Sequence, residues 1–419
     1  MTSRARGERD DIPRAAWAAS LGAMPVLCHL DPAEIQRLID DGAVETFADG
    51  AEVIRAGAPT SAVYFLVEGE CDVHRADRTV RLTAPAMAGE IAALTGTLRT
   101  ATVRAAGGVR TVVVSQERFL QAIRTSAAAG QALTELVADR ICAPDSIRQV
   151  GRFTIEGIVG SGGSGRVLRA RHPLLEIPIA LKMLSHALAL MPDAPRAFVG
   201  EASLLAQLDH PGIVRVLDAF EALGTFFIVM PWIEGATLRE LIDRGATFTA
   251  EELRRIAAEA LDALMTVHRA GLVHRDIKPS NIFVRSSGRV VLIDFGIACD
   301  AAVAPGAVGH GPGASRRDFV GTPAYSSPEQ ILGRAVDGRS DVYSLACTLY
   351  ELIFGRAPFG SEDVERAIDG HVHGDAAFDV PPVIQMDGAF LQWLRTCLSR
   401  TRARRPDAAA ALAALPALS

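Results

Sequence analysis

The stretch that decides the fold reads His274-Arg275-Asp276-Ile277-Lys278-Pro279-Ser280-Asn281. It offers a carboxylate, an ammonium group and an amide within one short loop. Asp294-Phe295-Gly296 follows directly after a predicted apolar strand over Val290–Ile293. Carboxylate and amide oxygens are the hard ligands that Mg²⁺ prefers, and a lysine neutralises the charge of phosphate oxygens. The pattern therefore predicts a site that handles phosphate groups together with a metal ion.

A glycine-rich turn lies upstream between two predicted strands and reads Val159-Gly160-Ser161-Gly162-Gly163-Ser164-Gly165-Arg166-Val167. Glycines at this spacing let backbone N–H groups approach phosphates closely. A position between two strands, and not between a strand and a helix, argues against a dinucleotide site. Flexible turns also produce the spacing, so the turn by itself leaves its role open.

The next predicted strand contains an ionisable side chain, in Ile179-Ala180-Leu181-Lys182. A lysine inside an apolar strand is costly unless it is paired. Glu201, on the predicted helix that follows at 195–207, is the natural partner. The alternative is an edge-strand lysine that points into water.

With these motifs in this order, residues 152–415 resemble the eukaryotic-like serine/threonine protein kinases of bacteria. Later landmarks agree with the resemblance. Residues 321–329 match the end of an activation segment, Asp341 matches the helix aspartate that braces the catalytic loop, and Arg405 matches an arginine that pairs with a glutamate of that segment.

The resemblance implies ATP and Mg²⁺ as cofactors and protein hydroxyls as substrates. Asp276 would orient the proton of the attacking hydroxyl and Lys278 would steady the γ-phosphate. The implied catalytic positions are Asp276, Lys278, Lys182 and Glu201, and the implied metal ligands are Asn281 and Asp294. The implied ATP-binding positions are Val159, Gly160, Ser161, Gly162, Gly163, Ser164, Gly165, Arg166, Val167, Ala180, Lys182, Met230 and Ile233.

Two further positions bear on activity. Pro231, in the hinge, lacks a backbone N–H, but the family's pattern takes the donor from Ile233. The activation segment, residues 297–320, contains one hydroxyl, Ser315, and Arg275 is suited to bind a phosphorylated loop. Ser315 is therefore the candidate phosphosite, with an ordinary solvated loop serine as the alternative.

The pattern is different over residues 45–116, where short alternating runs are separated by glycine. Segments 51–57, 62–75, 79–89 and 110–115 predict β-strands, with predicted helices at 31–40 and 116–140. The expected structure is a small β-roll flanked by helices.

One segment of this β-roll, Gly89-Glu90-Ile91-Ala92-Ala93-Leu94 with Arg99-Thr100-Ala101 after it, resembles the phosphate-binding cassette of cyclic-nucleotide-binding domains. The resemblance implies that Arg99 grips the cyclic phosphate beside Gly89. It also implies that Glu90 binds the ribose 2′-OH and that Thr100 and Ala101 line the pocket.

Two neighbouring positions depart from the cassette pattern, Ala88 where the family prefers phenylalanine and Leu98 where it prefers proline. Neither removes a ligand group. Either cAMP or cGMP fits as the effector, and a domain that binds no nucleotide and recruits partners is the alternative.

The expected architecture is multidomain: a cyclic-nucleotide-binding-like β-roll followed by an α+β bilobal protein kinase fold, in an order similar to cGMP-dependent protein kinases. The expected boundaries are a polar tail at 1–20, the regulatory domain at 21–142, a linker at 143–151 and the kinase at 152–415, with its N-lobe at 152–230 and C-lobe at 234–415.

Composition narrows the class of protein. A net charge of −6, from 43 Lys and Arg against 49 Asp and Glu, gives no electrostatic footprint for nucleic acid or for an anionic membrane. The sequence has no uninterrupted apolar run long enough to span a bilayer and no secretory signal, and its six cysteines lack the CxxC spacing. We expect a cytoplasmic protein.

The sequence thus favours an ATP-dependent serine/threonine kinase regulated by cyclic nucleotide. The alternatives are a kinase whose front domain is an interaction module, and a cyclic-nucleotide-responsive scaffold with an inactive kinase fold. The protein substrate, the direction of regulation and the oligomeric state stay open.

Overall fold

The computed structural model describes residues 14–59, 62–75, 78–95, 98–143, 148–162, 165–192, 194–295, 323–360 and 363–417. The chain divides into two compact units. One comprises Met1–Pro195 with Ala219–Val229, and the other comprises Arg196–Asp218 with Met230–Ser419. The predicted β-roll and most of the strands that follow it fall in the first unit, and the predicted helical region falls in the second.

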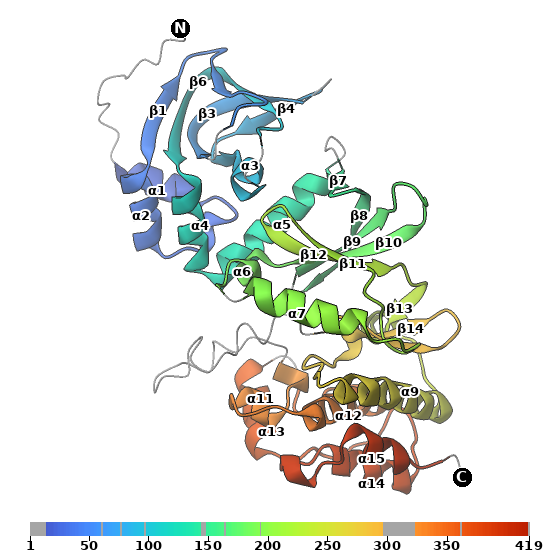
Figure 1. Cartoon of the computed structure of the whole chain (residues 1–419). Coiled ribbons are helices and arrows are strands. Elements are labelled where there is room, and N and C mark those ends of the chain that lie inside the picture. The colour runs from blue at the N-terminus through green and yellow to red at the C-terminus, as the bar shows by residue number, and fades with distance from the viewer. Residues whose placement is uncertain are drawn as a thin grey trace. The chain divides into compact units, whose positions relative to one another are not determined.

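The β-roll is a six-stranded sheet in which β3 and β6 are the long central strands (Figure 1). The strand order is β1-β6-β3-β4, with β2 on β6 and β5 on β3, and these pairs are antiparallel. Alternate residues of a strand point to opposite faces, so Phe65 and Leu66 of β3 pack into two different apolar clusters. The strands are β1 (Ala43–Phe47), β2 (Glu52–Ile54), β3 (Val63–Arg75), β4 (Arg78–Thr83), β5 (Ala86–Ala88) and β6 (Thr102–Val114).

Helices flank this sheet at α1 (Arg14–Gly22), η1 (Leu27–His29), α2 (Pro32–Asp41), α3 (Glu90–Thr95), α4 (Gln116–Arg124) and α5 (Ala127–Cys142). Helix α1 thus includes part of the stretch predicted as a polar tail, and Trp17 of this helix is buried in the apolar cluster. The single helix predicted over 116–140 is wrong. Ser126 caps α5 by accepting from the Ala129 N–H at 3.2 Å, and its hydroxyl donates to the His29 carbonyl at 2.8 Å, which ends one helix and begins another.

A second sheet in the first unit has the strand order β11-β12-β10-β9-β8-β7. Its elements are β7 (Gln149–Val150), β8 (Phe153–Gly162), β9 (Gly165–Arg171), β10 (Pro178–Leu184), the short helix α6 (His186–Ala189), β11 (Asp218–Ala222) and β12 (Thr225–Pro231). Leu133 and Val137 of α5 share one apolar cluster with Phe153 and Leu168 of this sheet. Helix α5, which follows the β-roll, and the second sheet therefore pack together, and the linker at 143–151 stays a prediction.

The second unit is mainly helical, and its central helix α12 is buried from Ser340 to Phe354. A helix covered on all sides belongs to a core, and the polar side chains of α12 are accordingly hydrogen-bonded within it. The elements of this unit are α7 (Ala194–Ala206, mostly within it), β13 (Gly235–Thr237), α8 (Leu238–Asp243), α9 (Ala250–Arg269), η2 (Pro279–Asn281), β14 (Ile282–Arg285), β15 (Val290–Leu292), η4 (Pro323–Tyr325), α11 (Pro328–Ile331), α12 (Gly338–Phe354), α13 (Val364–His373), α14 (Gly388–Cys397), η5 (Arg402–Arg404) and α15 (Ala408–Ala413).

Both predicted parts of the fold are thus present as an antiparallel β-roll with helices and a strand-rich region followed by a helical one. Within the described ranges, no helix combines the length and the apolar character needed to cross a membrane.

A buried ion pair fixes the end of the chain to the helical core. Arg405 donates to Glu329 through Nη1 at 2.9 Å and through Nη2 at 2.5 Å, and Ser340 donates to the same carboxylate. Burial opposes ionisation, but these hydrogen bonds prevail and hold the pKa of Glu329 below its ordinary value. The pair therefore stabilises the fold at neutral pH, and this contribution is lost as the pH falls through the lowered pKa.

We expect Arg405→Met to lower the free energy of unfolding by about 3–5 kcal/mol, because it leaves a carboxylate buried without its cation. Urea denaturation followed by circular dichroism measures the change. Arg404→Met, at an exposed neighbour, should change it by less than about 0.5 kcal/mol. Equal losses in the two variants would mean that the buried pair contributes no more than a surface arginine.

Candidate functional site

The loop between α9 and β14 brings three of the predicted site residues together. Lys278 Nζ lies 2.9 Å from Asp276 Oδ2, and Asn281 Nδ2 donates to the same oxygen at 2.9 Å and to the Asp276 carbonyl at 2.8 Å. The Asp276 carboxylate is therefore held in place by a cation and an amide. It is only partly buried, which leaves it accessible to a substrate group.

The backbone of this loop is anchored on a buried carboxylate. Asp341 of α12 accepts from the His274 N–H and the Arg275 N–H, each at 2.8 Å, and its Oδ2 lies 2.8 Å from His268 Nε2. The sequence predicted the bracing role of Asp341 by resemblance. It gave no indication of His268, because a histidine in the last turn of a helix is not diagnostic of any partner.

His274 joins the loop to the strand that precedes Asp294. Burial lowers the pKa of His274, although nearby carboxylates oppose the shift, so the imidazole is neutral at physiological pH. The neutral ring donates from Nε2 to the Ile293 carbonyl at 3.1 Å and accepts at Nδ1 from the Asp276 N–H at 3.4 Å. It also packs on Phe295, with ring centroids 4.4 Å apart.

Two residues of this region adopt left-handed backbone conformations that side chains other than glycine rarely take: Arg275 has φ 65° and Asp294 has φ 58°. Such positions cost roughly 1–3 kcal/mol each and collect at functional sites. At Arg275 the surroundings fix the geometry, since Asp341 accepts its N–H and Gln330 donates to its carbonyl at 2.7 Å.

The predicted metal ligands Asn281 and Asp294 come from adjacent backbone, because the Ile293 N–H donates to the Asn281 carbonyl at 3.0 Å. The amide nitrogen of Asn281 is used by Asp276, so its oxygen Oδ1 is the atom that remains for a cation; Ser280 approaches it only at 3.5 Å. An amide oxygen beside a carboxylate fits the hard, oxygen-ligated chemistry of Mg²⁺.

The glycine-rich turn lies in the first unit as the hairpin of β8 and β9. Val159 to Gly162 are in β8 and Gly165 to Val167 are in β9, while Gly163 and Ser164 lie outside the described residues. Lys182 is paired in register with Val167, and 7% of its surface is exposed. Ala180 lies two residues before it and so faces the same side of β10.

The remaining predicted kinase positions are only partly characterised. Met230 is buried at the end of β12, and Ile233 follows it in the connection to β13. Glu201 belongs to α7, and its pairing with Lys182 stays a prediction. Ser315 lies outside the described residues.

In the β-roll, Gly89 and Arg99 are in close contact. Gly89 has φ 87°, which favours glycine, and a Cβ at this position would lie 2.3 Å from Arg99 Nη1, so a larger residue would displace the guanidinium. Arg99 is 4% exposed, donates to the Gly89 carbonyl at 2.8 Å and to the Ala62 carbonyl at 2.5 Å, and lies over the Tyr64 ring at 5.8 Å from its centroid. Burial lowers the pKa of the Arg99 guanidinium, although electrostatic interactions with Tyr64 and Glu90 oppose the shift. An anion bound at this place would therefore stabilise a cation that has lost its water.

The second cassette residue, Glu90, is fully buried at the start of α3. Its Oε1 lies 2.6 Å from Arg140 Nη1 of α5, and Arg140 Nη2 donates to the Met87 carbonyl at 2.9 Å. Arg140 could not be singled out from the sequence, since the two partners are far apart along the chain. Thr100 is exposed and Ala101 is buried.

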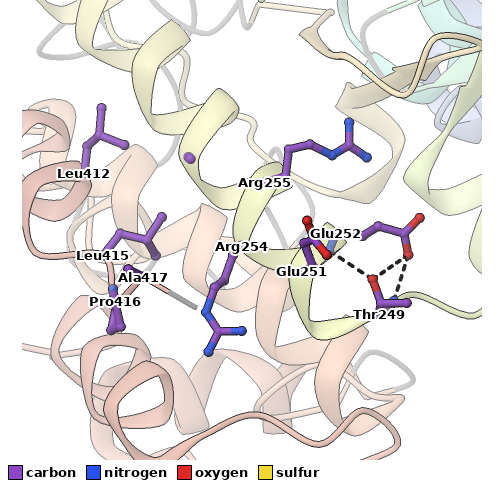
Figure 2. A pocket seen from close by; sticks show the side chains of 10 residues that line it. Thr249, Glu251, Glu252, Arg254, Arg255, Leu412, Leu415, Pro416 and Ala417 are labelled. Carbon is purple, nitrogen blue, oxygen red and sulfur yellow. Dashed lines mark hydrogen bonds between the residues drawn. The ribbon is translucent and has the colours of Figure 1, made fainter. Parts of the chain in front are cut away.

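A separate open hollow of about 800 Å³ lies in the second unit between the start of α9 and the C-terminal segment (Figure 2). The Thr249–Glu252 capping box and Arg255 line one side, and Leu412 and Leu415 line the other. Of the residues that line it, none is a predicted site residue.

Comparison with known proteins agrees with both parts of the chain. Residues 153–415 match the family described as "Protein kinase domain", and residues 44–126 match that described as "Cyclic nucleotide-binding domain". The serine/threonine-protein kinase PknB of Mycobacterium tuberculosis is 36% identical over 241 residues, which is 57% of this chain and 37% of that protein. The serine/threonine-protein kinase pkn3 of Myxococcus xanthus is 33% identical over 287 residues, 65% of this chain and 51% of that protein.

A probable serine/threonine-protein kinase PknB of Corynebacterium glutamicum is 35% identical over 228 residues, 54% of this chain and 34% of that protein. The chain thus spans between about a third and a half of the length of these relatives. The kinase match covers more than half of the chain, and the expected resemblance is confirmed. The chain belongs to the protein kinase family and carries a cyclic nucleotide-binding domain in front of its kinase domain.

Proposed function

We propose that this chain transfers the γ-phosphoryl group of ATP to serine or threonine hydroxyls of proteins, and that a cyclic nucleotide bound to its N-terminal domain regulates the transfer. The observation that carries the first part is the cluster in which Lys278 and Asn281 hold Asp276 Oδ2, each at 2.9 Å. Family membership and similarity to serine/threonine kinases support it.

In the proposed reaction the substrate hydroxyl gives its proton to the Asp276 carboxylate. Its oxygen forms a bond to the γ-phosphorus, and the bond from that phosphorus to the bridging oxygen breaks, so ADP leaves with the electron pair. Lys278 lies beside this carboxylate and places its positive charge where the transferred group becomes negative. Mg²⁺, which Asn281 and Asp294 would hold, supplies further positive charge for the phosphate oxygens.

Lys182 is the residue that we assign to a second contact with the phosphates, besides that of Lys278. It is an ammonium group that β10 holds almost completely out of water. A phosphate stabilises a desolvated cation more than an exposed one, because little water screens the attraction between the two charges. We assign Lys182 to the phosphates of ATP and Met230 and Ile233 to its base.

We expect Asp276→Asn to lower kcat by at least about 100-fold, because the amide keeps the size of the carboxylate but cannot accept the proton. Labelled phosphate transfer from Mg-ATP to a protein substrate measures it. Asp369→Asn, on the exposed side of α13, should keep the parental rate. Equal rates in the two variants would remove Asp276 from the mechanism, and the absence of transfer by the parental chain would favour the scaffold alternative.

The regulatory part of the proposal is supported by the cassette. Arg99 is a buried guanidinium whose Nη1 reaches the carbonyl of Gly89, and it lies within residues 44–126, which match the cyclic nucleotide-binding family. Glu90 supplies a carboxylate of the kind that accepts from a ribose hydroxyl. A planar, forked cation is suited to bidentate phosphate binding.

We expect Arg99→Lys to weaken binding of fluorescent cAMP and cGMP analogues by about tenfold or more, since lysine keeps the charge but loses the bidentate geometry. Titration of the purified chain with each analogue gives the affinities and identifies the preferred base. Arg104→Lys, an exposed position on β6, is the control. Binding that is equal in both variants would contradict the assignment, and no binding by the parental chain would favour an interaction module.

A further inference from the structure

Helix α5 contacts both the cyclic nucleotide-binding domain and the strands of the kinase domain, all within the first unit. Leu133 and Val137 are fully buried in the cluster that also contains Phe119 of the β-roll side and Leu168 of the kinase side. At Gly130 the two parts nearly touch, since a Cβ there would lie 2.6 Å from the backbone of Ala187 in α6. Helix α5 therefore packs tightly against both domains and contributes side chains to the core of each.

Buried polar groups fix the register of this contact. Thr134 and His186 are 1% and 0% exposed. The His186 N–H donates to Thr134 Oγ1 at 2.8 Å, this hydroxyl lies 2.9 Å from His186 Nδ1, and His186 Nε2 lies 2.9 Å from the Leu223 carbonyl. Because buried polar groups are costly to leave without hydrogen bonds, sliding of α5 along α6 is disfavoured.

Next to this contact, α5 reaches the glycine-rich turn. Glu135 Oε1 lies 2.8 Å from Nη2 of Arg166, the residue between Gly165 and Val167. Arg166 and Val167 are neighbours on β9 and so point to opposite faces of the sheet. Glu135 therefore contacts the turn on the face opposite Val167. A crevice lined by Glu135, Arg166 and Gly162 is too narrow to admit a water molecule.

The same helix reaches the nucleotide cassette from its other side. Arg140 contacts Glu90 at 2.6 Å and follows Glu135 by five residues. At 3.6 residues per turn these two side chains are about 140° apart around the helix. One face of α5 thus contacts the cassette, and nearly the opposite face contacts the turn assigned to ATP.

We propose that α5 is a positioning element that holds the glycine-rich turn ready for ATP through Glu135 and Arg166, and that the cassette acts on the kinase through this helix. A ligand hydroxyl that binds Glu90 competes with Arg140 for the carboxylate. Loss of the Arg140 contact changes how α5 is held at this end, and Glu135, on the same helix, passes that change to Arg166. The second step rests on the proposed binding of a cyclic nucleotide to the N-terminal domain. The first step does not, because it concerns the binding of ATP.

The first step is tested on the full chain with Glu135→Gln, with Asp139→Asn as the matched control. Asp139 is an exposed carboxylate on the same helix, so both variants remove one negative charge from α5. We expect Glu135→Gln to raise the KM for ATP roughly two- to fivefold, the range for a partly exposed ion pair, with kcat unchanged. The control should keep the parental KM.

A charge exchange separates positioning from a general loss of structure. Glu135→Arg and Arg166→Glu should each raise the KM for ATP, and the double variant should restore most of it. If KM is the same in Glu135→Gln and Asp139→Asn, or the double variant is no better than the single ones, the positioning role is wrong. Direct titration of ATP binding gives the same comparison if phosphate transfer is absent.

The second step is tested by repeating these measurements with cAMP and cGMP. In the parental chain the bound nucleotide should change the KM for ATP, and Glu135→Gln should bind the fluorescent analogue with parental affinity but lose this response. A response retained in Glu135→Gln overturns the coupling through α5. A parental chain that binds neither analogue overturns the proposed nucleotide regulation, and the KM comparison with Asp139→Asn still decides the first step.

Discussion

A carboxylate buried in a helical core is stable only if hydrogen bonds replace the water that it has lost. Asp341 is fully buried in α12, and it receives the backbone N–H groups of His274 and Arg275, with His268 Nε2 at the same distance of 2.8 Å. Moving the catalytic loop would remove both backbone N–H groups and leave His268 to compensate this charge. The position of the loop is therefore tied to the stability of the core, and the loop residues assigned to phosphate in the proposed reaction are held equally firmly.

Other groups of the site depend on this anchor. Fixing the Arg275 backbone leaves the following residue, Asp276, where Asn281 and Lys278 can reach its carboxylate. His274, neutral because it is buried, links the same loop to Ile293 and hence to Asp294. The left-handed conformation of Arg275 persists because hydrogen bonds to its N–H and to its carbonyl over-determine it. Rigidity of this kind is what a transfer reaction needs, since positioning supplies most of its catalysis.

The first unit is organised by packing that crosses a domain boundary. The cyclic nucleotide-binding domain and the kinase strands are separate families in sequence, yet α5 buries side chains in a core common to both. Area buried between two domains makes their motions dependent on each other. Two domains that share a core in this way differ from two domains on a flexible linker, because a change in one of them alters the packing of the other.

By itself the sequence determined the motifs and the elements that carry them. The catalytic loop, the glycine-rich turn, the strands on either side of that turn and the strand that contains Lys182 follow from local patterns, since alternation and turn glycines depend on near neighbours. The break between α4 and α5 also has a local cause, because Ser126 is a helix-capping residue. The helix-forming residues on both sides of it nevertheless led to the prediction of one continuous helix.

Only the tertiary structure decided which side chains meet. Glu90 with Arg140, Thr134 with His186 and Glu135 with Arg166 are pairs far apart in the chain. No local pattern selects such partners, because a polar or charged side chain on a helix or strand can equally well be exposed to solvent. Their pairing depends on how α5 packs, and that packing is set by the shape of the whole apolar core. The candidate site residues could be named from local motifs and their resemblance to known families, whereas the contact between the N-terminal domain and the kinase strands depends on packing that no motif records.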